Sequence, residues 1–247
     1  MEEKYGGSYG GSYGGARPGR QTGNMAYTVD MVFCIDATGS MEDLTGNQQR
    51  IINMVKENAL SFYQDMERKM QEKKKVMAQL RVRVIAFRDY LADGAQAMMA
   101  TDFYLLPQQA AEFEACIKSI HADGGGDIPE DGLEALAYAM RSNWTEHGDR
   151  KRQVIVIWTD AGTHELGFGA RSPYYPKGMP KDLSELEDWW DAMNNYAKRL
   201  IIYAPKEKYW NYISENWEKV VQVDSAAGDG MAEHEFEDIL NVIANSI

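Results

Sequence analysis

Oxygen-bearing side chains follow an apolar run early in the chain, in the stretch "MVFCIDATGSM" at 31–41. Asp36, Thr38 and Ser40 stand at i, i+2 and i+4, and all three can face one ion if the chain turns at Gly39. Oxygen-only ligand sets suit hard cations such as Mg²⁺, Ca²⁺ or Mn²⁺. Because 36–40 contains neither histidine nor cysteine, zinc is disfavoured at this motif.

Two further segments carry acids in comparable positions. A second apolar run ends in "TDAGTH", which supplies Asp160, and a glycine-rich stretch, "DGGGDIPED" at 123–131, supplies Asp127, Glu130 and Asp131. Glycines let the backbone turn tightly and approach a ligand closely. We expect these segments to lie beside the Asp36 motif. We expect a structural role for His164.

The elements that must position these residues alternate along the chain. Long apolar strands separated by helical patterns predict an α/β fold with three αβα layers, in which helices cover both faces of a mostly parallel sheet. In such sheets ligands bind beyond the carboxyl ends of the strands. The expected strands are 28–36, 80–90, 103–106, 152–160, 199–205 and 219–225; the expected helices lie within 42–75, 107–121, 128–142, 182–197, 206–217 and 232–246.

The first residues differ from the rest. Residues 1–25 are rich in glycine, tyrosine and serine and repeat the unit YGGS. Glycine this dense does not bury enough surface to offset the entropy of ordering, so we expect a flexible tail. A linker or a remnant of cloning is favoured over a Tyr/Gly segment that binds a partner. One domain is expected over 26–247.

Composition limits the classes of partner. The formal net charge is −12, which argues against nucleic acid, because binding to its backbone depends on Lys and Arg. The sequence has no apolar signal core and no stretch approaching the ~20 apolar residues that span a bilayer. Its two cysteines make neither a disulfide framework nor a zinc site. We expect a cytoplasmic protein that does not bind membranes.

Three motifs together carry a family resemblance. "DATGS" resembles the D-x-[ST]-x-S signature of von Willebrand factor A (vWA) domains, known as the metal-ion-dependent adhesion site (MIDAS). "GGGDIPE" and "WTDAGTH" are similar to the corresponding loops of integrin β-type A domains. The chain also resembles bacterial intracellular vWA proteins of the tellurium-resistance type. The resemblance covers about 28–247 in layout.

The resemblance implies a role for each matching residue. Asp36, Thr38 and Ser40 would bind the metal, Mg²⁺ or else Ca²⁺ or Mn²⁺, directly or through water. Glu130 would lie beside the ion, and Asp160 would support it. Most A domains have a threonine in the middle loop. Asp127 lies near that position, but Glu130 is favoured over Asp127 for the principal site.

Integrin β-type domains also carry flanking metal sites. Asp89 and Asp127 match positions of one of them, and Asp43 matches an acid of the other. Two departures weaken the match: Gly125 replaces the expected asparagine, and Leu44 replaces an expected acid. A second metal is therefore expected less strongly than the first.

The resemblance implies a binding module rather than an enzyme. Its metal would bond a carboxylate of a partner protein, which could be a kinase or phosphatase of a bacterial stress or signalling system. The segment 167–183 should overhang the site and bring Arg171, Tyr174, Tyr175 and Lys177 to it. Trp189 and Trp190 are as well suited to packing a helix on the core as to contacting a partner.

Two alternatives stay open. One is a scaffold whose metal is purely structural. The other is a phosphatase-type hydrolase, since an Asp-Thr strand end also resembles the haloacid-dehalogenase motif DxDx[TV]. Thr38 replaces the second Asp of that motif, so the general acid is missing, and no Walker lysine follows the first strand.

Overall fold

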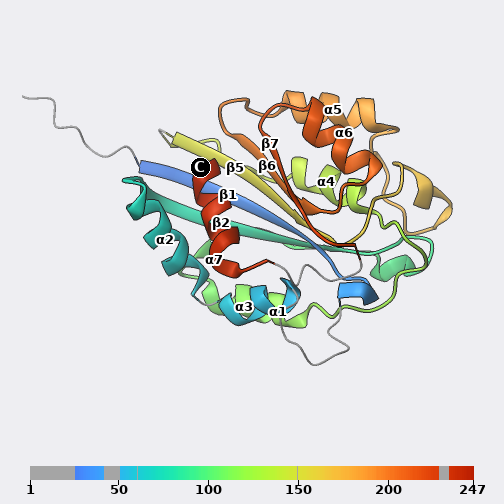
Figure 1. Ribbon diagram of the computed structural model, residues 1–247, viewed down its shortest axis with the longest axis horizontal. Coiled ribbons are helices and arrows are strands. Elements are labelled where there is room, and N and C mark those ends of the chain that lie inside the picture. Colours follow the sequence, from blue (N-terminus) through green and yellow to red (C-terminus); the bar gives the residue numbers. More distant parts are fainter. Residues whose placement is uncertain (1–25, 42–50, 60, 149, 228–233) are drawn as a thin grey trace, which may run out of the picture.

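The computed structural model describes residues 26–41, 51–59, 61–148, 150–227 and 234–247 (Figure 1). It confirms the predicted fold class: a seven-stranded, mostly parallel sheet lies between two layers of helices. The hydrogen-bonded order is β3-β2-β1-β5-β6-β7, and β4 pairs with β2. The strands are β1 Ala26–Asp36, β2 Val76–Phe87, β3 Met98–Ala100, β4 Tyr104–Leu106, β5 Arg150–Trp158, β6 Lys198–Ala204 and β7 Val220–Asp224.

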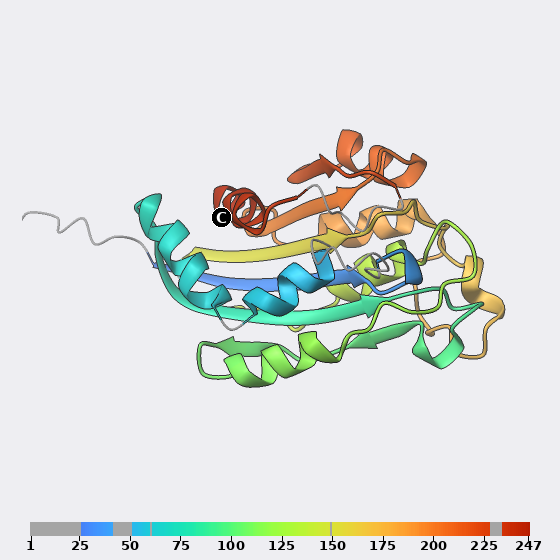
Figure 2. The same ribbon diagram turned by 60° about the horizontal axis from the view of Figure 1, so that its bottom comes forward.

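The central strands are parallel, and β3 and β4 pair antiparallel with β2 at the edge. From β1 the chain first adds β2 on one side and later returns to add β5 on the other. The strand order therefore reverses beside β1, and open α/β sheets bind ligands at such a reversal. The carboxyl ends of β1, β2 and β5 point to the same edge (Figure 2).

Each face of the sheet has its own apolar cluster. One contains Met31, Phe33 and Ile35 of β1 and lies under α1 Ile51–Asn58, α2 Phe62–Glu72, α3 Ala110–Ser119 and α7 Phe236–Ser246. The other contains Val32 and Cys34 and lies under α4 Gly132–Met140, α5 Leu183–Ala192 and α6 Lys208–Asn216. Side chains alternate along a strand, so apolar runs such as β1 and β5 belong where both faces are covered.

Several predicted bounds were wrong. The helical segment expected over 42–75 is α1 followed by α2, and α2 ends at Glu72. Lys74 takes a left-handed backbone conformation (φ 56°), after which β2 begins at Val76 rather than at residue 80. The helix expected from 128 begins at Gly132, which leaves Glu130 in a loop. The helix expected to reach 197 ends at Ala192, and β3 was not predicted.

Other expectations fall where the structure gives no description. Asp43 and residues 1–25 lie outside the described residues. In the part of the chain that is described, no helix combines the length and the apolar character needed to cross a membrane.

Candidate metal centre

Asp36 ends β1 and is fully buried. Its Oδ1 accepts hydrogen bonds from the Thr38 amide (2.9 Å) and the Thr38 hydroxyl (2.6 Å), and its Oδ2 accepts one from the Thr159 hydroxyl (2.6 Å). The chain then enters a short 3₁₀ turn, Gly39–Met41. The turn brings Asp36, Thr38 and Ser40 to one point, as their spacing predicts.

Asp160 joins this group from the loop after β5. The Ser40 hydroxyl donates to Asp160 Oδ1 (2.8 Å), and the hydroxyl oxygens of Thr38 and Ser40 are 3.4 Å apart. Asp160 is 1% exposed. The two strand ends predicted to converge therefore do so.

Glu130 completes the set from the loop before α4. The loop is held against the segment after β5, because the Glu130 amide donates to the Gly162 carbonyl (3.2 Å) and the His164 amide donates to the Glu130 carbonyl (2.9 Å). A Cβ added at Gly125 would lie 3.2 Å from Glu130 Oε1 and 3.3 Å from Thr38 Cβ. Gly125 thus lies between the Glu130 carboxyl group and Thr38.

The described residues place no basic side chain against two of these acids, Asp36 and Glu130. Among the described residues, neither Asp36 nor Glu130 pairs with a basic side chain, and Glu130 Oε2 is buried without a hydrogen-bond partner. Burial raises the pKa of Asp36 to about 6, and the charge of Asp160 adds to the rise. Burial, followed by the charges of Asp36 and Asp89, raises the pKa of Glu130 to about 9.

These observations fit a divalent cation. Three clustered acids repel one another when ionised, and a cation between them relieves that repulsion. The donors are carboxylate and hydroxyl oxygens, which hard cations prefer. The site opens into a hollow of about 400 Å³, whose walls include Ser40, Asp127, Ile128 and Ala227.

A glycine-rich loop forms one wall of the hollow. Gly124 (φ 74°) and Gly125 (φ 83°) have left-handed backbone conformations, which glycine adopts without strain. The Asp93 carboxylate accepts the Gly125 amide at 3.1 Å, and the Gly39 amide donates to the Gly124 carbonyl. The sequence interpretation missed Asp93. Its only signal was an acid four residues after Asp89, in "DYLAD".

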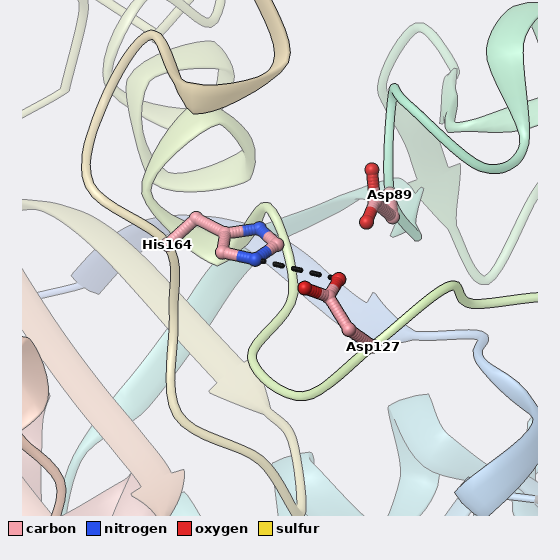
Figure 3. A group of neighbouring side chains, drawn as sticks. All are labelled: Asp89, Asp127 and His164. Atoms are coloured by element: carbon pink, nitrogen blue, oxygen red, sulfur yellow. Dashed lines mark ion pairs between the residues drawn. The ribbon is translucent and has the colours of Figure 1, made fainter.

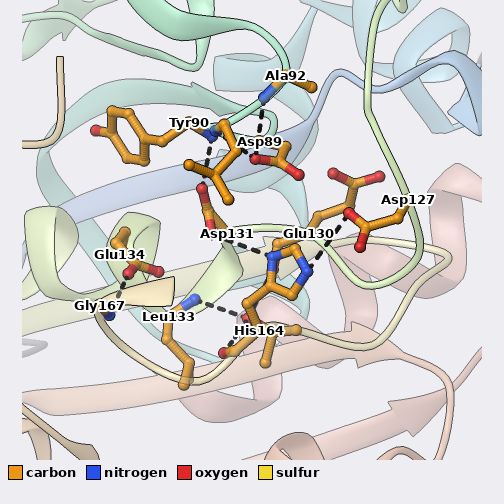
Figure 4. Close-up of polar contacts among 12 residues, drawn as sticks. Asp89, Tyr90, Ala92, Asp127, Glu130, Asp131, Leu133, Glu134, His164 and Gly167 are labelled. Atoms are coloured by element: carbon orange, nitrogen blue, oxygen red, sulfur yellow. Dashed lines mark hydrogen bonds and ion pairs between the residues drawn. The ribbon is translucent and has the colours of Figure 1, made fainter. Parts of the chain in front are cut away.

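A second group of donors lies beside the first: Asp89, Asp127 and His164 (Figure 3). Each offers one ligand atom, and these atoms lie within 4.8 Å of one another. His164 Nε2 is 3.6 Å from Asp127 Oδ1, and its Nδ1 is 3.3 Å from Asp131 Oδ1 (Figure 4). Burial opposes a charge on His164, but Asp131 and Asp127 outweigh burial and raise its pKa.

His164 was expected only to be structural, and Asp131 was expected only at a helix start. Asp131 is the residue before α4, whereas the predicted helix from 128 had included it, and it also accepts the Tyr90 amide at 2.7 Å. The signal for His164 was its place four residues after Asp160. Arg88, the residue before Asp89, donates to the carbonyls of Ala37, Gln96 and His121.

The segment after β5 lies beside these groups. Phe168 stacks on His164, with ring centroids 3.8 Å apart, and Tyr175 packs against Tyr90. Tyr174 is 58% exposed. Farther along, Trp190 is buried in the core, whereas Trp189 lies under the guanidinium of Arg141 (3.6 Å).

No family model and no curated protein matches the chain. Among solved structures, the fold is similar to that of proximal thread matrix protein 1 from the mussel byssus, with a TM-score of 0.51 and 11% identity. The match covers 90% of this chain and 49% of that protein, so the chain spans about half its length. At this identity the likeness concerns the fold alone.

Proposed function

We propose that the chain is a vWA-type binding module whose MIDAS-like site captures an acidic group of a partner protein through a divalent cation, Mg²⁺ or else Ca²⁺ or Mn²⁺. The observation that carries the proposal is the convergence of Asp36, Thr38, Ser40, Glu130 and Asp160 at the strand-order reversal. One Glu130 oxygen there is buried and has no hydrogen-bond partner in the described part of the chain.

Each residue has a distinct task in this proposal. Asp36, Thr38 and Ser40 would hold the ion on the rigid end of β1, and Asp160 and Glu130 would add charge from the neighbouring loops. A bound divalent cation supplies a Lewis-acidic position that a carboxylate can occupy. The hollow in front of the site, with Ile128 79% exposed at its wall, gives a partner room to approach.

The same arrangement favours binding over hydrolysis. Thr38 takes the position of the acid that a dehalogenase-type phosphatase would need, and its hydroxyl donates to Asp36. The idea that the partner is a kinase or phosphatase of a bacterial stress or signalling system comes from the sequence resemblance alone. The feature of the partner that the site itself would recognise is a surface carboxylate.

The test is capture of partners by the immobilised full chain in Mg²⁺. We expect EDTA and peptides containing aspartate to release the proteins that are retained in Mg²⁺. We expect the immobilised Asp36→Ala variant not to retain them. Asp188→Ala is the matched control, since Asp188 is an exposed acid on α5, away from the site. Equal retention by Asp36→Ala and the natural chain would contradict the proposal.

A further inference from the structure

We propose that Asp89, Asp127 and His164 bind a transition-metal ion of the Zn²⁺ class, at a site separate from the oxygen-only group around Asp36 (Figure 3). The three residues come from three loops at the carboxyl edge of the sheet: after β2, before α4 and after β5. Asp89 and Asp127 match a flanking metal position in the sequence resemblance; the inference adds His164 as a ligand, and with it a different class of ion. It does not depend on the proposed function.

The imidazole of His164 is the first argument. The residue is 6% exposed, and among the described residues its Nε2 has no hydrogen-bond partner. The ring turns this nitrogen toward Asp127, whose Oδ1 at 3.6 Å is beyond hydrogen-bonding distance (Figure 3). Buried polar atoms are normally paired, so this nitrogen points to a group that the described residues do not supply.

The opposite ring nitrogen is the second argument. His164 Nδ1 faces Asp131 Oδ1 at 3.3 Å, and Asp131 is fully buried and held by the Tyr90 amide at 2.7 Å (Figure 4). A metal-binding histidine almost always donates its second ring N–H to such a carboxylate. With the proton on Nδ1, the lone pair of Nε2 is directed toward Asp127.

The two acids are the third argument. Asp89 is 1% exposed, and its Oδ1 accepts the amides of Leu91 (2.6 Å) and Ala92 (3.3 Å). Its Oδ2 lies near Gly126: a Cβ added to Gly126 would be 3.5 Å from this oxygen. Asp89 is therefore fixed before any ion binds, and the exposed Asp127 closes the site from the solvent side.

The donor set decides the class of metal. One imidazole nitrogen and two carboxylates are three protein ligands, the number that leaves a zinc ion an open position. Imidazole suits Zn²⁺ and its neighbours, whereas Mg²⁺ and Ca²⁺ prefer oxygen alone. His164 thus distinguishes this site from the adjoining Asp36 group by its chemistry.

A proton is the competing explanation. A protonated His164 between Asp127 and Asp131 would satisfy the same geometry as an ion pair on each side. Affinity for Zn²⁺ distinguishes the two explanations. If a proton on His164 is all that the geometry serves, the three residues are not expected to bind Zn²⁺ tightly.

The experiment is a calorimetric titration of the full chain, without a polyhistidine tag, with Zn²⁺ in excess Mg²⁺. Titration with Co²⁺ reports nitrogen ligation through its visible absorption. We expect one site whose affinity falls about 100-fold or more in His164→Gln, since losing even an outer partner of a ligand costs about 10- to 100-fold. His121→Gln, at an exposed histidine, is the control and should bind as the natural chain does.

Two more variants complete the test. Asp127→Asn changes an exposed side chain and should lose Zn²⁺ affinity even if His164→Gln folds poorly. Asp36→Ala should still bind Zn²⁺ but should no longer bind Mg²⁺. The Zn²⁺ site and the proposed Mg²⁺-dependent binding function are therefore tested independently. The inference is overturned if the natural chain does not bind Zn²⁺ in Mg²⁺, or if Asp127→Asn binds it as tightly as the natural chain.

Discussion

Two buried glutamates on neighbouring turns of the chain differ in what surrounds them. Glu130 has one oxygen without a partner among the described residues and lies with Asp36 at the candidate metal centre. Glu134, in the first turn of α4, also has a buried Oε2 without a partner among the described residues, but its Oε1 accepts the Tyr175 hydroxyl (2.7 Å) and the Gly167 amide (3.1 Å). Glu134 thus anchors the segment after β5, whereas we propose that Glu130 faces an ion.

Glu134 makes stability depend on pH. Burial, and then the charge of Asp131, raises its pKa from 4.5 to about 7. A raised pKa favours the neutral form in the folded state, so this contribution to stability is complete below pH 4.5 and is lost as pH rises through 7. We predict that Glu134→Gln gains thermal stability relative to the natural chain between pH 4.5 and pH 8. Thermal unfolding of both chains across this range is the measurement, and a constant difference would be the opposite result.

At the scale of elements, the glycine-rich loop is held by one carboxylate. A Cβ added at Gly124 would lie 1.9 Å from Asp93 Oδ1, whereas one added at Gly167 would meet nothing within 4 Å. Both glycines have positive φ, so alanine is strained at both and clashes only at the first. Gly124 therefore keeps the loop close to Asp93.

This difference gives a paired prediction. Gly167→Ala should cost about 1 kcal/mol from backbone strain, and Gly124→Ala should cost about 1–3 kcal/mol more from overpacking and weaken Mg²⁺ binding as well. Chemical denaturation and Mg²⁺ titration of the two variants measure both effects. Equal stability of the two would show that Asp93 moves freely.

The amino-terminal half of β1 is fixed by a largely buried ion pair. Arg81 of β2 donates to both oxygens of Asp30 (2.8 and 2.7 Å), and the Thr145 amide donates to the same carboxylate (2.6 Å). Asp30 is 1% exposed. The pair joins β1, β2 and the segment after α4, away from the carboxyl edge of the sheet that carries the candidate metal centre.

Removing one partner of this pair should be costly. Asp30→Ala leaves the Arg81 charge without its partner, and we predict a loss of about 3–5 kcal/mol in unfolding free energy. Asp224→Ala breaks an exposed pair with Lys206 and should cost less than about 1 kcal/mol. Denaturant unfolding compares the two, and similar losses would mean that the buried pair adds little.

The sequence predicted elements unevenly, for physical reasons. The strands 28–36 and 152–160 were predicted within two residues of β1 and β5, because apolar runs covered on both faces have few alternatives. The polar segment 42–75 has weak stop signals, so the break between α1 and α2 and the turn at Lys74 were not visible. "IPED" resembles a helix start, but its backbone pairs with the segment after β5 instead.

The part of the candidate site that lies at strand ends was predicted, and the part that lies in loops was predicted less completely. Asp36 and Asp160 follow apolar runs, so their convergence comes from the parallel sheet itself. The places of Asp93, Asp131 and His164 depend on how three loops pack, which local sequence does not specify. The orientation of His164, stacked on Phe168 with Nδ1 on Asp131, is a tertiary property of this kind.

At the scale of the whole molecule, we expect the fold to form without the candidate ion. Both faces of the sheet carry large apolar clusters away from the metal centre, and burial of apolar surface dominates stability. We predict that EDTA lowers the melting temperature but leaves the far-ultraviolet circular dichroism spectrum at 25 °C unchanged. Loss of the spectrum in EDTA would instead favour a scaffold with a structural metal.

The most direct test of the account is thermal unfolding of the natural chain, Asp36→Ala and Asp188→Ala over a series of Mg²⁺ concentrations, repeated with Ca²⁺ and Mn²⁺. An ion that binds only the folded state raises the melting temperature with its concentration. We predict such a rise for the natural chain and Asp188→Ala, and none for Asp36→Ala. The account is contradicted if no ion shifts the natural chain, or if Asp36→Ala responds as the natural chain does.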